Sequence, residues 1–463
     1  MKPTKKVKAA YYKRRASALI VSLMFVLIFS ALAISMMTMS GTNVQLASNH
    51  HHVNNALAAA QSGQEVVRYW LSRVLFSSST LQANYFTTIV AGIKNDLSTN
   101  GITNVSLQLD GSIGAVALNS NTGLTFDGQI QIDSNQPTIL QTRVTGHSGD
   151  IARTITILYN IQPYVFPIFN FGLATKGPVN FPGNPTITAV NSSWEADIFI
   201  ESASNPIAML TIGNLNFDGN INIGNPGANV DFQATVQIAG DFGQPAIDNH
   251  VSIGNDSPEF PVPDTDHFRT YATGPIINSS TDLSKGMTLT NATIAPGTNP
   301  VFLQNVIING VLFIESPNKV TFTRNVALNG LIAADGDINN PDPAINRIDF
   351  QGNFASGPYP SDPQFDVMRE EEGTSILAPG FFTTFSGNFS ALEGVVAVSG
   401  AHFAGNVNAQ IKGSIINYSN SPTVIEGNAT MNFNRAGSTK IPAGFDLYRE
   451  LDYVPASYAE SAL

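Results

Sequence analysis

The chain has 463 residues, a length that predicts two or three structural units, and only 12% of them are charged, about half the usual fraction. The first 15 residues hold seven of the 23 Lys and Arg residues, so the remainder has 16 basic against 34 acidic residues, a net charge of −18. Such a surface repels nucleic acid and anionic lipid, and we expect neither as a partner. The absence of cysteine excludes a disulfide framework and thiolate chemistry.

The first predicted element is an apolar helix that begins near residue 16. Residues 16–39 (ASALIVSLMFVLIFSALAISMMTM) carry no charge and are long enough to cross the roughly 30 Å hydrocarbon core of a bilayer. The basic leader 1–15 contains no acid, so we expect it in the cytoplasm and residues 40–463 outside. A cleavable signal peptide is the alternative, but its apolar region is usually about 7–15 residues long.

Helical character continues beyond the apolar run to about residue 75. Residues 43–75 contain no proline, and the section ALAAAQSGQEVVRYWL at 56–71 is rich in helix formers. A basic leader, an apolar helix and an Ala-rich continuation together resemble type IV pilin-like proteins, most closely the N-terminal segment of PilX-type minor pilins. The residues that carry the resemblance are RASALIV at 15–21 and AAAQSGQE at 58–65.

This resemblance implies cleavage by a prepilin peptidase between Ala16 and Ser17. Major pilins have Phe at the first mature position and Glu at the fifth, whereas this chain has Ser17 and Val21. The resemblance also implies an inner-membrane protein that associates with other pilin-like subunits through its helix. It covers about the first 75 residues and implies nothing about the rest of the chain.

Residues 76–165 are predicted to form a small α+β unit. After the helix ends, apolar and polar residues alternate at 105–109, 128–132, 140–144 and 153–158, which is typical of half-buried strands. Clusters of Gly, Asn, Asp and Ser between these segments predict turns. We therefore expect an antiparallel sheet at about 101–162 that packs on the outer half of the helix.

From residue 177 to 434 the sequence repeats a Phe-x-x-Asn kernel with Gly bends. Intervals between kernels are 20, 28, 35, 18 and 22 residues from Phe302 onward, and coils of about 20 residues indicate a right-handed parallel β-helix. Phe would stack inside, and Asn would form ladders between coils. The kernels are Phe181/Asn184, Phe217/Asn220, Phe302/Asn305, Phe322/Asn325, Phe350/Asn353, Phe385/Asn388, Phe403/Asn406 and Ile425/Asn428.

Three longer intervals are predicted to be loops that leave the coils, at 239–300, 335–347 and 357–373. The fold class is thus mainly β: a long transmembrane helix with a small α+β unit, and then the β-helix. A β-sandwich is the fallback, because its strands also alternate and its turns also use glycine. The final segment 441–463 is aromatic and charged, and we expect it to cap the last coil, with a docking patch as the alternative.

No constellation of residues predicts a catalytic, cofactor or metal site. The best acidic clusters are Asp256/Glu259 with Asp264/Asp266/His267, and Asp335/Asp337 with Asp342, and each lies in a predicted loop where acids are usually solvated. Consecutive histidines at 50–52 point in different directions on a helix, and the acidic run 370–372 is typical of a solvated loop.

The sequence therefore predicts a minor structural component of a type IV pilus-like or type II secretion-like filament. Its β-helix would be a display or adhesion surface, for which an extracellular glycan or another surface ligand is a candidate partner. The alternative is a membrane-anchored polysaccharide lyase or hydrolase, because many enzymes of these classes are parallel β-helices. In either case the expected location is the bacterial inner membrane, with the C-terminal part periplasmic or extracellular.

Overall fold

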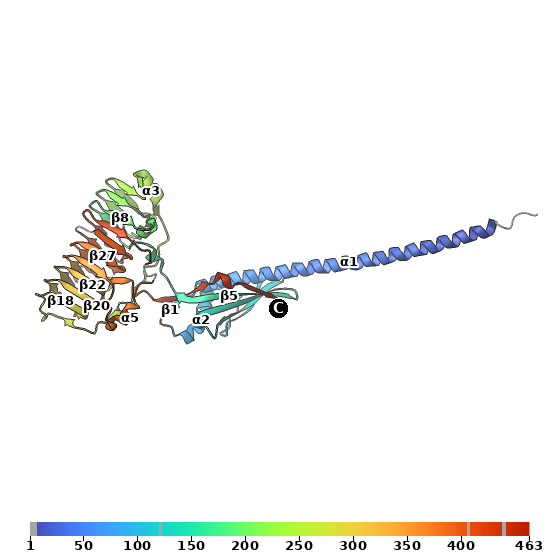
Figure 1. The fold of residues 1–463 in the computed structure, drawn as a ribbon, viewed down its shortest axis with the longest axis horizontal. Helices are drawn as coiled ribbons and strands as arrows, with labels where there is room; N and C mark the ends of the chain where they lie inside the picture. Colours follow the sequence, from blue (N-terminus) through green and yellow to red (C-terminus); the bar gives the residue numbers. More distant parts are fainter. Residues whose placement is uncertain (1–6, 120–122, 405–407, 438–440, 463) are drawn as a thin grey trace, which may run out of the picture. The chain divides into compact units, whose positions relative to one another are not determined.

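The computed structural model describes residues 7–119, 123–404, 408–437 and 441–462, with side chains described from Ala18 onward inside the first helix. The chain divides into two compact units. The anchor unit comprises Met1–Gln162 and Arg449–Leu463, and the β-domain comprises Pro163–Tyr448 (Figure 1). The predicted order of a long apolar helix followed by a mainly β chain is confirmed.

The anchor unit consists of helix α1, helix α2 and one antiparallel sheet. Helix α1 spans Val7–Ser72, so it begins inside the predicted leader and ends three residues before the predicted end. The sheet order is β1-β34-β5-β4-β3-β2, and β35 also pairs with β5. The elements are α2 (Tyr85–Thr99), β1 (Phe76–Ser77), β2 (Ser112–Asn119), β3 (Leu124–Ile132), β4 (Ile139–Ser148), β5 (Ile151–Pro163), β34 (Tyr448–Tyr453) and β35 (Ala459–Ala462).

Two predictions about this unit are wrong. Residues 105–109 form no strand but only a single bridge from Leu107 to Ile113, because the chain turns at Gly111, whose φ is +82°. The C-terminal segment 441–463 is not a cap on the coils, because β34 and β35 pair within the sheet of the anchor unit. The β-domain is therefore an insertion in the sequence of the anchor unit, between β5 and β34.

The β-domain is built from three rows of parallel strands. One nine-stranded sheet has the order β13-β10-β7-β32-β29-β26-β23-β21-β19. Its strands are β7 (Val179–Phe181), β10 (Ile207–Thr211), β13 (Asn229–Phe232), β19 (Val301–Phe302), β21 (Lys319–Phe322), β23 (Arg347–Phe350), β26 (Phe382–Phe385), β29 (Ala401–Phe403) and β32 (Thr423–Ile425).

The other two rows belong to one nineteen-stranded sheet that bends at glycines, and we call them row one and row two. Long strands contribute to both rows: β18 (Met287–Ile294), β20 (Val306–Ile314) and β22 (Val326–Ala334). Row one continues through β24 (Phe354–Gly357), β27 (Phe389–Glu393), β30 (Asn408–Lys412), β33 (Thr430–Phe433), β8 (Thr186–Ala189), β11 (Leu215–Phe217), β14 (Val236–Ile238) and the antiparallel β15 (Asp241–Phe242). Row two contains β17 (Ile276–Ile277), β25 (Thr374–Ala378), β28 (Val395–Val398), β31 (Ile415–Asn417), β6 (Leu173–Thr175), β9 (Ile198–Ile200), β12 (Ile221–Ile223) and β16 (Val251–Ile253).

The coils do not stack in sequence order. Strands β6, β7 and β8 of the first coil pair with β31, β32 and β33 of the last. The chain therefore enters the stack in its middle, winds to one end at β16, returns to the other end at β17, and winds back to the middle (Figure 1). Because the described strand neighbours of the β-domain are parallel apart from β14–β15, the β-sandwich fallback is wrong.

Row two is buried on both faces. The inner face joins the main core, while outward side chains such as Val311 and Phe313 form a second core with the segments that cover them. These segments include short helices: α4 (Asp266–Arg269), α5 (Asp366–Arg369) and the 3₁₀ turns at Pro167–Asn170 and Pro363–Phe365. Burial on both faces explains the uninterrupted apolar runs of row two. Parts of the predicted loops 239–300 and 357–373 thus cover the coils, while α3 (Gln244–His250) packs against β14–β16 at one end.

Phe side chains stack along the nine-stranded sheet. Phe302, Phe322, Phe350, Phe385 and Phe403 lie in one column with centroids 4.9–5.2 Å apart and ring planes within 9°. This offset-stacked spacing adds to the free energy gained by burying the rings. Ile425 continues the column beside Phe403, and Phe181 lies one coil farther on.

We predict that Phe322→Ala or Phe403→Ala lowers the free energy of unfolding of the β-domain by about 3–5 kcal/mol, because each leaves a cavity in the stack. Phe242→Ala is the matched control, since that ring is 57% exposed in the same domain. Denaturant unfolding of the full-length protein measures the difference. Equal midpoint shifts in the stack variants and the control would show that the stack does not stabilise the domain.

Candidate functional site

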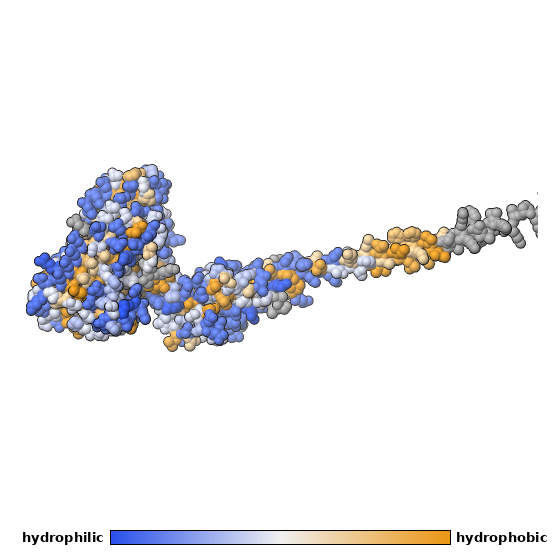
Figure 2. Space-filling view, viewed as in Figure 1, coloured by the Kyte–Doolittle hydropathy of each residue, from blue (hydrophilic) through white to orange (hydrophobic). Residues whose placement is uncertain are grey.

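Helix α1 carries the functional surface of the anchor unit. From Ala18 onward it is long and apolar enough to span a membrane, and its most apolar window has none of its surface buried by the rest of the chain. Phe25 and Phe29 are 56% and 66% exposed, and the apolar part of the helix stands out in Figure 2. An apolar surface of this size in water is costly, so a bilayer or other helices must cover it.

The outer half of α1 is fixed to the sheet by a close approach at Gly146 in β4. A Cβ atom at this position would lie 2.2 Å from both the Ala56 carbonyl oxygen and the Ala60 backbone nitrogen. Only glycine, facing the small side chains of Ala56, Ala59 and Ala60, allows helix and strand to approach this closely. The Ala-rich stretch that carries the pilin resemblance is therefore also the packing surface for the sheet.

A buried hydrogen-bond cluster continues this contact one to two turns farther along the helix. The Gln64 side-chain amide, which is 3% exposed, donates to the Thr142 hydroxyl at 2.9 Å and to the Tyr159 hydroxyl at 3.2 Å. Burial raises the pKa of Tyr159 to about 12, so the phenol stays neutral at physiological pH. Nearer the membrane segment, His52 Nδ1 and the Ser148 hydroxyl lie 2.9 Å apart.

We predict that Gly146→Ala destabilises the anchor unit by about 1–3 kcal/mol, because the methyl group would force helix and strand apart. Gly41→Ala is the matched control, since a Cβ there meets no atom within 4 Å and should raise helix stability. Thermal unfolding of the detergent-solubilised protein measures the stability of both variants against the wild type. A loss of stability for Gly41→Ala comparable to that for Gly146→Ala would contradict the close-packing argument.

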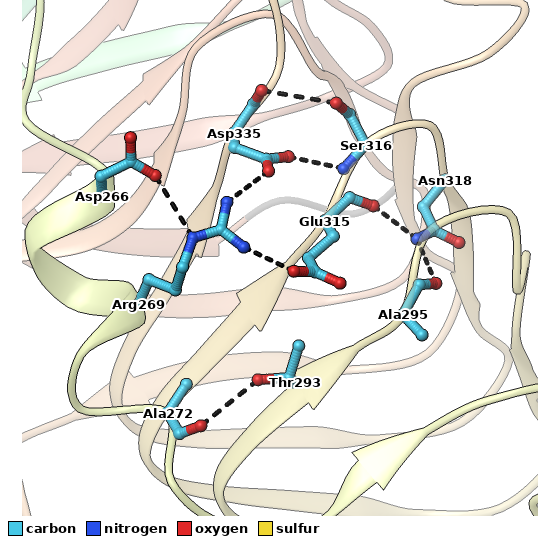
Figure 3. Close-up of polar contacts among 9 residues, drawn as sticks. All are labelled: Asp266, Arg269, Ala272, Thr293, Ala295, Glu315, Ser316, Asn318 and Asp335. Carbon is cyan, nitrogen blue, oxygen red and sulfur yellow. Dashed lines mark hydrogen bonds and ion pairs between the residues drawn. The ribbon is translucent and has the colours of Figure 1, made fainter.

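In the β-domain, the two predicted acidic clusters converge on Arg269. The guanidinium pairs with Asp266 at 3.3 Å, with Asp335 at 2.6 Å and with Glu315 (Figure 3). It also lies 4.2 Å from the centroid of the Phe313 ring. Burial lowers the pKa of Arg269, but the carboxylates outweigh this and the net shift is upward. One acid from each predicted cluster is therefore a counter-ion of a partly exposed arginine that attaches α4 to row two.

Three further acids of these clusters, Asp264, Asp337 and Asp342, also have structural partners. The Asp264 carboxylate accepts from the His267 backbone N–H, while Asp337 and Asp342 accept from backbone N–H groups two residues ahead. His267 Nε2 lies 2.8 Å from Glu371, which also accepts from the Tyr271 hydroxyl. Among the residues that the structure describes, no group of three or more His, Asp or Glu is placed to hold a metal ion.

A cavity of about 410 Å³ opens in the β-domain at the bend between rows one and two. Its lining includes Phe169, Tyr359, Glu372, Glu393, Lys412 and Asn434. The sequence analysis singled out Glu372 only as part of a solvated run and missed the other five. Their positions are scattered over 266 residues of sequence, and only the coil register brings them together.

The Asn residues of the predicted Phe-x-x-Asn kernels make several kinds of hydrogen bond between coils. Asn side chains of the column accept from the backbone of the next coil, as in Asn325 N–H to Asn305 at 3.2 Å and Asn353 N–H to Asn325 at 3.2 Å, rather than pairing amide to amide. An amide pair occurs at Asn184 and Asn428, 3.4 Å apart. Asn388 accepts through its backbone carbonyl from Phe354, and Asn406 lies outside the described residues.

The predicted kernel of Phe217 and Asn220 is wrong in both of its residues. Phe217 lies in β11 of row one, between Ile187 and Ile238, and is outside the column. Asn220 lies between β11 and β12, at the bend from row one to row two, and is therefore not at the corner that follows the Phe column.

Asn220 also has different partners from those that an Asn ladder requires. Its backbone N–H and its side-chain amide both donate to the Asp197 carboxylate, at 2.7 Å and 3.2 Å. Its side-chain oxygen lies 3.1 Å from His250 Nδ1. Asn220 thus contacts an acid and a histidine of the neighbouring coils, and the prediction that it belongs to the ladder is corrected.

The coil that continues the column has no Phe-x-x-Asn kernel at the column position, because its Phe217/Asn220 pair lies in row one and at the bend. It presents Thr211 beside Phe181, and then Phe232 beside Thr211. Asn214, three residues after Thr211, donates its backbone N–H to the Asn184 side chain at 2.9 Å. A search for Gly-Asn at the corner, without requiring Phe, would have found this copy.

The predicted cleavage position between Ala16 and Ser17 lies in the part of α1 whose side chains are outside the described residues. Comparison with known proteins bears on this region. Residues 17–65 match the family described as PilX N-terminal. The N-terminal segment is type IV pilin-like. The match begins at the predicted first mature residue and ends in the pilin-like helix, where α1 packs on the sheet.

Outside residues 17–65, the comparisons give no match that supports an argument about fold or role. No curated protein matches the sequence. Among solved structures, the crystal structure of competence-associated pilin ComZ from Thermus thermophilus is similar over 89% of this chain and 98% of its own, with 11% identity and a TM-score of 0.29. This value is too low to carry an argument about the fold or role of the β-domain.

Proposed function

We propose that this protein is a minor structural subunit of a type IV pilus-like or type II secretion-like filament. The observation that carries the proposal is the unburied apolar length of α1 in a segment that matches the PilX N-terminal family. A helix of this kind is stable in the inner membrane before assembly and among the helices of other pilin-like subunits afterwards. The basic leader favours a cytoplasmic N-terminus.

The β-domain is proposed to be the displayed part of the subunit, a right-handed parallel β-helix outside the inner membrane. Its insertion between β5 and β34 supports this role, because both of its chain ends return to one sheet of the anchor unit. A module inserted in this way can vary while the pilin-like helix and sheet are retained. An adhesion or display surface needs stable coils, which the Phe column and the buried row two provide.

A structural role is favoured over catalysis by a polysaccharide lyase or hydrolase. Such enzymes need paired carboxylates with perturbed pKa values, or a bound cation. Five of the acids that the sequence offered for this purpose are held by Arg269 or by backbone N–H groups. These contacts stabilise the segments that cover the coils.

We predict that the mature protein in its native host begins at Ser17 and retains the apolar helix, because the leader ends where the family match begins. Edman sequencing or mass spectrometry of the N-terminal peptide from membrane fractions measures this. A start at Met1 would contradict prepilin processing but leave the membrane anchor intact. A start beyond residue 40 would mean that the apolar segment is a removed signal peptide, and it would overturn the filament proposal.

A further inference from the structure

The cavity at the bend of the β-domain has the size of a small-ligand site. Its volume of about 410 Å³ lies within the range of roughly 300–1,000 Å³ that such sites occupy. Row one contributes the ion pair of Glu393 and Lys412, and the covering segments contribute Phe169 and Tyr359. The cavity is formed entirely by the β-domain.

The floor of the cavity is formed where the strands bend at glycines, and a side chain at these glycines would clash with the neighbouring coil. A Cβ at Gly394, where φ is +103°, would lie 2.6 Å from the Gly373 carbonyl carbon, and one at Gly413 would lie 2.2 Å from the Gly394 oxygen. Successive coils therefore pack backbone against backbone at the bend, and no side chain there fills the space above it. The floor of the cavity therefore follows the coil register.

The walls carry polar groups suited to hydroxyl ligands. Glu393 and Lys412 are 2.6 Å apart, so this pair offers both an acceptor and a donor at fixed positions. Tyr359 is half-buried, and its hydroxyl makes no hydrogen bond to the residues that the structure describes. Burial raises the pKa of Tyr359, so the phenol remains a neutral donor. A hydroxyl on a cavity wall that makes no hydrogen bond to a described protein group is available to a ligand in the cavity.

We propose that this cavity binds a neutral glycan segment of about one or two sugar rings. Sugar rings present apolar C–H faces, which the aromatic rings of Tyr359 and Phe169 match, and outward hydroxyls, which the Glu393–Lys412 pair, Asn434 and the Tyr359 hydroxyl match. Carboxylates and a lysine at fixed positions can accept from and donate to one sugar at the same time. The inference rests on the proposed display role and specifies the ligand class.

The charges favour a neutral ligand over an anionic one. Glu372 and Glu393 line the same cavity, and the only nearby cation besides Lys412 among its described lining residues is Arg435. The Arg435 guanidinium donates to the carbonyl oxygens of Phe169 and Asn170, and its charge lies against Glu195 and Asp197. Among the described lining residues, a uronic acid or sulfated sugar would therefore meet two carboxylates with one cation available to compensate.

The test is calorimetric binding of full-length protein to neutral disaccharides of glucose, galactose, mannose and N-acetylglucosamine, with uronic acid and sulfated disaccharides as comparison. The protein is kept in a detergent without a sugar headgroup, because a maltoside would compete. We expect at least one neutral disaccharide to bind, and Tyr359→Phe to weaken its binding about fivefold through loss of one hydrogen bond. Tyr458→Phe is the matched control and should leave binding unchanged.

Three results would overturn the proposal: no binding of any neutral disaccharide, binding of anionic disaccharides alone, or equal binding by Tyr359→Phe and the wild type. Cleavage of a bound disaccharide would instead overturn the structural role argued above, in favour of the enzyme alternative. Failure here is distinguishable from failure of the filament role. A protein that assembles with pilin-like subunits but binds no sugar refutes only the glycan site, whereas one that binds sugar but never assembles refutes only the filament role.

Discussion

The β-domain depends on the parallel pairing of its first coil with its last. Strands β6–β8 lie against β31–β33, so two stacks of coils that are distant in sequence share one core (Figure 1). The pairing requires every corner to repeat in register, since a shift of one residue would turn each strand's buried side chains outward. Glycines at the bends and the Phe column enforce this register, because neither tolerates a displaced neighbour.

The pairing of the first coil with the last places both chain ends of the β-domain at the middle of the stack. A solenoid that began at one end and finished at the other would leave its two chain ends far apart. Here the chain enters and leaves at the middle of the stack, which allows the domain to be inserted between β5 and β34 of the anchor sheet. The anchor unit thus completes its sheet only after the entire β-domain has been made, and β34 and β35 are its last strands.

Some features could be predicted from the sequence because they depend on local pattern. The uncharged run of residues 16–39, three of the four predicted strands of the small sheet and the spacing of Phe302, Phe322 and Phe403 all follow from residue type and period. The identity of β34 could not be predicted in this way. Its residues are aromatic and charged, and they form a strand only because β1 and β5 supply two neighbours that are remote in sequence.

The errors in the repeat have a similar cause. Phe217 and Asn220 satisfy the kernel but lie in row one and at its bend, whereas Thr211 lacks the aromatic ring but occupies the column. Register decides the position, and the position tolerates Thr, Ile or Phe. The cavity residues were missed because they lie on different coils or covering segments. The acidic clusters were noticed, but only the structure shows that Arg269 neutralises its two aspartates together.

The central claim is that α1 is the helix through which this chain joins a pilin-like assembly. A photo-crosslinking amino acid at Phe25, which is 56% exposed on the apolar segment, tests it most directly in the native host. The account predicts covalent adducts with the helices of other pilin-like subunits, in both membranes and sheared filaments, and none from a crosslinker at the buried Ala56. Adducts with lipid alone, and none with another subunit, would contradict it.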